Sequence, residues 1–208
     1  MGAPSLKSRV EIAPARGRYD RTLDEDARDA AQRARVLQAT AEQLAARGRS
    51  ATTVEHIIIH AGISRATFYQ HYEDLEHAVA DVMQLLEQRV VSPCRAALSG
   101  EPTPRGQLQA MATAYLVEAE SHPHLVLAGA LVPDVAQAQS MLCVLLQPAM
   151  QRWLDGARRA GLAAPSASVT QRWLAALFEA AGVELVLRGG ALGDLAERLA
   201  RGCTALAR

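Results

Sequence analysis

A four-residue break, Ala61-Gly62-Ile63-Ser64, separates two short helical stretches and constrains the fold more than any other feature of the sequence. Gly62 can take a left-handed backbone at little cost. Ile63 can fill a core, and Ser64 can cap the helix that follows. The spacing predicts a helix-turn-helix whose two helices cover about residues 54–60 and 65–72.

The second of these helices has two unlike faces. Phe68 and Tyr72 are one turn apart and should point into a core. The residues between them should be more exposed, namely Arg65, Ala66, Tyr69 and Gln70. This helix therefore offers polar and small side chains to a partner.

Long helices are expected on both sides of the motif. Thr22 and Glu25 have the spacing of a capping box, and apolar residues then recur every three or four positions until Gly48. Asp74 can cap a further helix that continues past Leu86 towards Pro93.

The C-terminal half also has helical periodicity, interrupted by Gly- and Pro-rich breaks. A linker lies at 99–102, and Pro123 and Pro133 interrupt the chain further on. Pro148 is expected to kink an apolar stretch. The expected helical segments are about 107–121, part of 135–160, 167–188 and 191–206, with a loop at 161–166.

Composition agrees with an all-α chain. Half of the residues are hydrophobic, but only 4% are aromatic, and the abundant Ala, Leu and Arg favour helices. No apolar run reaches the roughly 20 residues of a membrane span, and no secretory signal is recognisable, so a cytoplasmic protein is expected. Cys94, Cys143 and Cys203 are odd in number and far apart, and we expect them to be reduced.

The formal net charge is zero, so bulk charge gives no argument for nucleic acid. Residues 1–23 nevertheless carry five cations, of which Lys7 and Arg9 come first, against Glu11 and Asp20. Two interpretations stay open for this basic arm: it follows a phosphate backbone, or it is a solvated terminus.

The runs 53–57 and 61–72 together resemble the DNA-binding motif of the TetR family of transcriptional regulators. The resemblance covers about residues 28–80. It implies an all-α fold of about nine helices, in which a three-helix DNA-binding domain precedes a larger helical domain for ligand binding and dimerisation. The expected ranges are a basic arm at 1–22, the helix-turn-helix domain at 23–73 and the regulatory domain at 74–208.

Arg65 is the expected base reader, because its guanidinium can pair bidentately with a guanine edge, worth about 1–3 kcal/mol of discrimination. Ala66 could contact a thymine methyl group, and Gln70 is a second candidate for a base edge. The resemblance implies that Thr53, Thr67, Tyr69 and His71 contact phosphates. The full expected DNA-binding set is Thr53, Ser64, Arg65, Ala66, Thr67, Tyr69, Gln70 and His71.

Two positions depart from the family pattern. Ile58 stands where a small Ala is usual, and extra volume at a helix crossing can cost about 1–3 kcal/mol. Leu75 stands where a phosphate-binding Lys is frequent, between Asp74 and Glu76. The basic arm could offset the missing cation.

No pattern for catalysis or metal binding is strong. There is no phosphate-binding Gly-rich loop, nucleophile elbow or His-Glu-x-x-His pair, so neither enzyme activity nor a cofactor is expected. His56 and His60 lie four residues apart, and His122 and His124 lie near Glu118 and Glu120, but neither group supplies a complete zinc ligand set.

A ligand pocket and a dimer interface are expected in the C-terminal domain. Core packing is an alternative role for each pocket candidate. These candidates are Met111, Tyr115, Met141, Trp153, Trp173 and Phe178. The last two helices are the expected dimer interface, through Leu174, Leu177, Leu185, Leu195 and Leu199.

The expected function is a homodimeric regulator, a repressor that binds a palindromic DNA operator and is released by a small-molecule effector. The alternative is a helical interaction protein of the same fold that has lost sequence-specific DNA binding. A small helical enzyme is a third, weaker interpretation.

Overall fold

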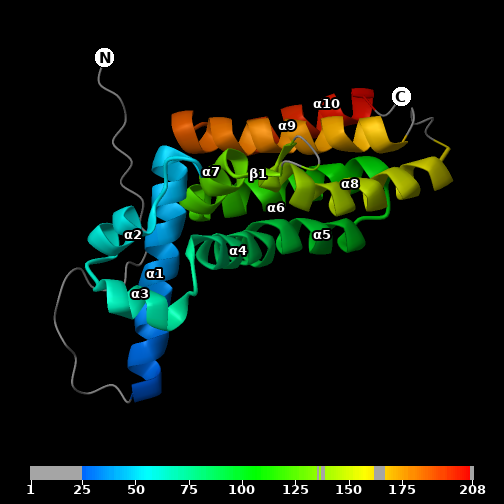
Figure 1. Cartoon of the computed structure of the whole chain (residues 1–208). Helices are drawn as coiled ribbons and strands as arrows, with labels where there is room; N and C mark the ends of the chain where they lie inside the picture. The colour runs from blue at the N-terminus through cyan, green and yellow to red at the C-terminus, as the bar shows by residue number, and fades with distance from the viewer. Residues whose placement is uncertain (1–24, 135, 137–138, 162–166, 207–208) are drawn as a thin grey trace.

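The computed structural model describes residues 25–134, 136, 139–161 and 167–206. The basic arm, Thr22 of the expected capping box and most of the loop expected at 161–166 lie outside these residues. Figure 1 shows the described chain as an assembly of helices. Among the described helices, none combines the length and the apolar character that crossing a membrane requires.

The N-terminal part, which we call the head, consists of α1 (Glu25–Arg47), α2 (Val54–Ala61) and α3 (Arg65–His71). Gly62 ends α2 with φ 65°, in the left-handed region. Thr53 caps α2 by accepting a hydrogen bond from His56 N at 3.3 Å, and Ser64 caps α3 by accepting from Thr67 N at 3.0 Å. The predicted helix-turn-helix is therefore confirmed, together with the roles of its turn residues.

The remainder of the described chain, which we call the body, consists of helices, short connections and one small hairpin. Its helices are α4 (Leu75–Leu86), α5 (Ser92–Ala97), α6 (Pro104–Ser121), α7 (Pro123–Leu131), α8 (Met141–Arg159), α9 (Ala167–Arg188) and α10 (Leu192–Leu206).

The helix that Asp74 caps does not end near Pro93. A π-helical turn, Glu87–Val91, joins α4 to α5, and a 3-10 turn, Leu98–Gly100, follows. Pro93 lies just after the π-helical turn, where the regular α-helical hydrogen-bond pattern is already interrupted. Because α4 and α5 form one continuous rod, the described residues contain nine helical rods, as predicted.

A two-stranded hairpin precedes α8 and was not predicted. In it β1 (Pro133–Asp134) pairs antiparallel with β2 (Gln139–Ser140). Strands of two residues are too short to show an alternating pattern in sequence. Pro148 lies inside α8, as expected.

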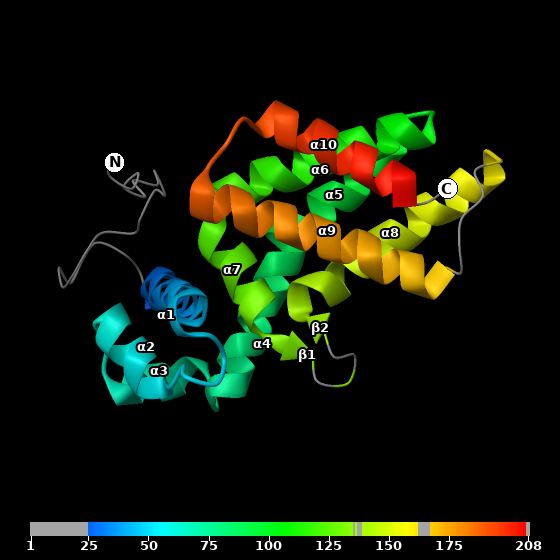
Figure 2. The same ribbon diagram turned by 90° about the horizontal axis from the view of Figure 1, so that it is seen from above.

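The buried apolar side chains form two clusters that share one helix. Val36 and Ala39 of α1 pack in the head cluster, with Phe68 and Tyr72 among others. One turn further along α1, Leu44 packs in the large body cluster. Figures 1 and 2 show α1 between the other head helices and the body. The orientation of the head therefore depends on how α1 packs against the body.

All three cysteines are free and buried in the body. Burial raises the pKa of the Cys143 and Cys203 thiols to about 12, and it raises the pKa of Cys94 further. Cys94 donates a hydrogen bond to Val90 O at 2.8 Å. These thiols are therefore protonated core groups at neutral pH.

Candidate nucleic-acid interface

The helix α3 presents the side chains that its periodicity predicted. Phe68 and Tyr72 are buried in the head cluster, with ring centroids 5.8 Å apart. The opposite side is exposed. We call it the reading face; it consists of Arg65, Ala66, Tyr69 and Gln70.

The hydroxyl groups of Thr53, Ser64 and Thr67 already have partners at the helix starts. Ser64 Oγ and Thr67 Oγ1 lie 2.9 Å apart and share a hydrogen bond. Thr53 is exposed at the start of α2. These groups hold the two helices at the turn, and the exposed Thr53 and Ser64 lie beside the reading face.

His71 is placed differently from the rest of the expected DNA-binding set. Its side chain is only 4% exposed, and Nδ1 lies 3.8 Å from Asp29 Oδ1 of α1. Its Nε2 is buried without a hydrogen-bond partner. Because the last turn of α3 faces α1, the ring is covered, and in this placement it is not available for the expected phosphate contact.

Both departures from the family pattern are core residues. Ile58 is buried in the head cluster. Leu75 packs against both the head and the body clusters. Glu76, the acid beside it, forms an ion pair with Arg49. Leu75 thus connects the two apolar clusters, and Arg49 offsets the charge of Glu76.

The head and the start of α4 are together slightly acidic, because Glu73, Asp74 and Glu76 follow α3. Residues 25–77 contain eight acidic residues and six arginines, with no lysine. The acids are Glu25, Asp26, Asp29, Glu42, Glu55, Glu73, Asp74 and Glu76; the arginines are Arg28, Arg33, Arg35, Arg47, Arg49 and Arg65. Attraction to DNA must therefore come from the local placement of cations on the surface.

Arg65 does not stand alone on the reading face. Its Nη2 donates a hydrogen bond to Glu55 Oε2 at 2.6 Å. Glu55 was missed as a functional candidate, although it lies in the first turn of α2. The helix-turn-helix geometry, which brings the starts of its two helices near each other, was the signal that could have identified it.

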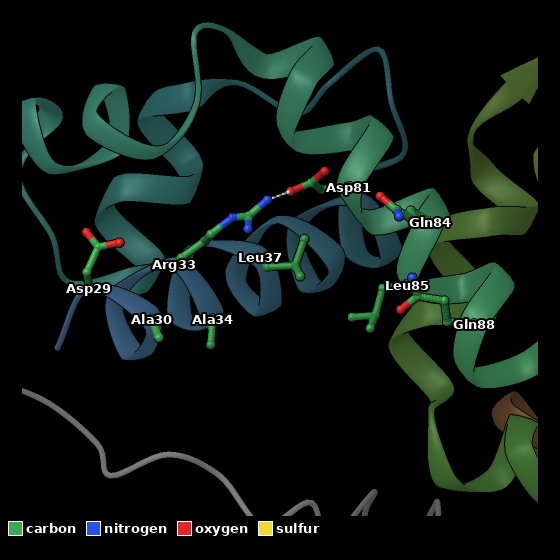
Figure 3. A pocket seen from close by; sticks show the side chains of 9 residues that line it. All are labelled: Asp29, Ala30, Arg33, Ala34, Leu37, Asp81, Gln84, Leu85 and Gln88. Carbon is green, nitrogen blue, oxygen red and sulfur yellow. Dashed lines mark hydrogen bonds and ion pairs between the residues drawn. The ribbon is translucent and has the colours of Figure 1, made fainter. Parts of the chain in front are cut away.

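An open groove of about 630 Å³ lies between α1 and α4. Arg33 of α1 crosses it to Asp81 of α4, with Nη2 and Oδ2 2.7 Å apart (Figure 3). The guanidinium also lies 5.9 Å from the centre of the Tyr72 ring. The hydrogen bond to Asp81 raises the pKa of Arg33, and burial raises the pKa of Tyr72. This charged contact ties the head to the body, and no sequence pattern pointed to it.

Four of the six expected pocket residues are buried in the large body cluster: Met111, Tyr115, Trp153 and Phe178. The Tyr115 and Phe178 rings are 5.5 Å apart, and the buried Tyr115 hydroxyl has no hydrogen-bond partner. Met141 packs at the edge of this core.

Trp173 is separate from this group. It is 55% exposed on α9, so in this arrangement it does not line an internal site. The reason is that α9 carries apolar residues on several faces, which hides the inward direction from a periodicity argument.

The expected dimer residues also need correction. Leu174, Leu185 and Leu199 are buried in the core of the protomer itself, and Leu177 and Leu195 are partly buried against it. The exposed large apolar residues of α9 are instead Val169, Trp173 and Leu187. The outward face of α9 therefore differs from the one expected, and its role as a dimer interface stays a prediction.

Two of the candidate metal-binding histidines, His60 and His122, lie beside a carboxylate. His60 pairs with Glu42 of α1, and His122 Nε2 lies 3.6 Å from Glu118. Burial lowers the pKa of His122. In the described part of the chain, no three His, Cys, Asp or Glu side chains are grouped so that they could hold a metal ion.

Comparison with known proteins finds a family match that covers most of the head and the start of α4. Residues 36–76 match the family described as bacterial regulatory proteins, tetR family. This segment covers the second half of α1, the helix-turn-helix and the start of α4. No curated protein matches the sequence significantly.

Solved structures with the same fold cover both head and body. A TetR family transcription regulator from Marinobacter aquaeolei VT8 is 22% identical, with a TM-score of 0.66 over 87% of this chain and 97% of the other. The fatty acid degradation regulator FadR from Bacillus halodurans is 12% identical, with a TM-score of 0.66 over 85% and 96%. A gamma-butyrolactone receptor described as ArpA-like is 18% identical, with a TM-score of 0.60 over 85% and 99%. At these identities the likeness concerns the fold.

Proposed function

Because residues 36–76 match the tetR family of bacterial regulatory proteins, we propose that this chain is a transcriptional regulator of that family, a homodimeric repressor that binds a palindromic operator and is released by a small molecule. The main support for DNA binding is the exposed reading face of α3. This face begins at Arg65, the first residue of the helix, and the helix is capped by Ser64. A short helix presented in this way fits the major groove, and its N-terminal residues reach base edges.

In this proposal Arg65 reads a guanine edge and Ala66 packs against a thymine methyl group. Gln70 reads a second base edge. Thr53, Ser64, Thr67 and Tyr69 position the head on the phosphate backbone without reading sequence.

Dimerisation occurs through the exposed apolar face of α9, with α10 beside it. Exposed apolar residues rimmed by polar ones are typical of protein interfaces. Val169, Trp173 and Leu187 would lie in that interface, and Ala176 and Ala180 between them are also exposed. A two-fold dimer presents two reading faces to two half-sites, which is why the operator is expected to be palindromic.

The effector enters the body core near Tyr115. Its hydroxyl is the reason for this choice, because a buried polar group without a partner is costly and a ligand could satisfy it. Met111, Trp153 and Phe178 would supply apolar contacts. Release from DNA requires that the effector bind the DNA-incompetent arrangement more tightly than the competent one.

Selection of bound duplexes from a random DNA pool tests the proposal directly. The expected result is a palindromic consensus, bound with an affinity that exceeds that for random duplex by roughly 10³-fold or more at physiological salt. Arg65→Gln should lower this preference and relax the consensus at one position in each half-site. Equal affinity for selected and random DNA across salt concentrations would instead favour the helical interaction protein, which the acidic balance of residues 25–77 also supports.

A further inference from the structure

Glu55 is the carboxylate that faces the expected base reader. It lies in the first turn of α2, and its Oε2 accepts the hydrogen bond from Arg65 Nη2 at 2.6 Å. The first turn of α3 has no acidic residue of its own. The Arg65 and Glu55 side chains are 62% and 56% exposed, so the pair lies at the surface beside the reading face.

The exposure of this pair limits its role in stability. Surface ion pairs contribute about 0–1 kcal/mol, because water screens the charges and two long side chains lose freedom. Little is therefore lost when the guanidinium adjusts to a DNA partner. The ion pair therefore contributes little to the fold, and the question is what the Glu55 charge does when DNA approaches.

Two effects follow from a carboxylate at this position. Guanidinium is planar and has several N–H donors, so one edge can stay on Glu55 while another pairs with guanine O6 and N7. The carboxylate thereby holds the guanidinium plane. It also repels phosphates, so it weakens the sequence-independent attraction of Arg65 to the DNA backbone.

We propose that Glu55 is a specificity-determining residue that positions Arg65 on a base edge and lowers affinity for DNA of the wrong sequence. This proposal rests on the proposed function, because it requires that the chain bind DNA through α3. Among the ion pairs described in the head, those of Arg33 and Arg49 reach α4 instead, so they hold the fold and leave the reading face free.

Two substitutions separate charge from positioning. Glu55→Gln removes the charge but keeps an oxygen that can accept from Arg65, whereas Glu55→Ala removes both. Affinities for a selected duplex and for a random duplex of equal length would be measured by fluorescence anisotropy at several salt concentrations. Both variants should bind random DNA more tightly, and the salt slope should steepen by up to about 0.9 for one additional phosphate contact.

The decisive quantity is the ratio of the affinity for the selected duplex to the affinity for the random duplex. Glu55→Ala should lower it roughly fivefold to a hundredfold, which is the discrimination of one bidentate base contact, and Glu55→Gln should lower it less. Asp155→Asn on α8 is the matched control, because it removes the same charge from a partly exposed acid–Arg contact within one helix, outside the head and outside the proposed dimer face. It should leave both affinities unchanged.

Failure of the inference can be distinguished from failure of the proposed function. If the wild type prefers its selected DNA and both Glu55 variants keep the wild-type ratio, the role of Glu55 is overturned alone. Loss of binding to both DNAs in Glu55→Gln, with unchanged thermal unfolding, also overturns it. If the wild type has no preference and Arg65→Gln changes nothing, DNA reading through α3 is itself overturned.

Discussion

At the scale of single residues, Gly182 determines how α9 can pass Tyr115. A Cβ at position 182 would lie 2.2 Å from the Tyr115 hydroxyl oxygen and 2.7 Å from Cζ. Tyr115 is fully buried, so its ring has little room to move. The absence of one methyl group therefore lets the largest side chain of α6 pack against α9.

We predict that Gly182→Ala lowers the free energy of unfolding by about 1–3 kcal/mol through overpacking, even though Ala is a better helix former than Gly. Chemical denaturation monitored by circular dichroism measures the change. Tyr115→Phe should recover part of the loss in the double variant, because it removes the nearest atom. Gly156→Ala in α8 is the control, since its Cβ would meet only a side-chain oxygen at 3.5 Å; equal losses at 156 and 182 would contradict the packing argument.

At the scale of elements, the head is attached to the body mainly through α1, which packs against α7 and α4. Leu75 joins the apolar clusters, and Arg33–Asp81 adds a charged contact across the groove (Figure 3). Asp81 is 18% exposed, so its carboxylate is screened less than those of the surface pairs. The relative placement of α1 and α4 therefore has an electrostatic contribution as well as an apolar one.

A double-mutant cycle on Arg33→Gln and Asp81→Asn should give a coupling free energy of about 0.5–1 kcal/mol, at the upper end for partly exposed pairs. Raising the salt concentration should reduce it. Hydrogen exchange should also quicken in the described N-terminal turns of α1 in either single variant. The corresponding cycle on Asp155 and Arg158, both within α8, serves as the reference. A coupling no larger than in that reference pair would show that the contact does not tie the helices.

At the scale of the whole molecule, the outer face of α9 is the surface on which a second copy is expected. Trp173 and Leu187 are more than half exposed there. The α9 leucines buried in the protomer cannot serve this purpose, because they are already packed in its core. A charge on this face should therefore separate dimer formation from protomer folding.

Trp173→Arg is expected to shift the dimer to monomer by light scattering while leaving thermal unfolding of the protomer nearly unchanged. Affinity for a palindromic duplex should fall roughly a hundredfold, because the second head no longer binds as part of one molecule. Val117→Arg, on an exposed position of α6, should remain dimeric. Leu185→Asp should instead unfold the protomer, and a Trp173→Arg protein that stays dimeric would exclude this face.

Local patterns in the sequence were sufficient for the helices and for the reading face. The turn chemistry of Gly62 and Ser64 acts over a few residues, and the Phe68/Tyr72 period fixes which side of α3 is outward. Such interactions are short in range, so they can be predicted without knowledge of the rest of the chain.

Tertiary structure alone decided which faces of the C-terminal helices are inward. An Ala- and Leu-rich helix such as α9 is apolar on several sides, so only its neighbours determine that Leu185 is core and Trp173 is surface. Contacts between distant segments could not be predicted from the sequence either. Examples are the ion pair of Arg33 with Asp81 and the covering of His71 by α1. The sequence thus determined the elements and the motif, while packing between elements determined which side chains are free to bind a partner.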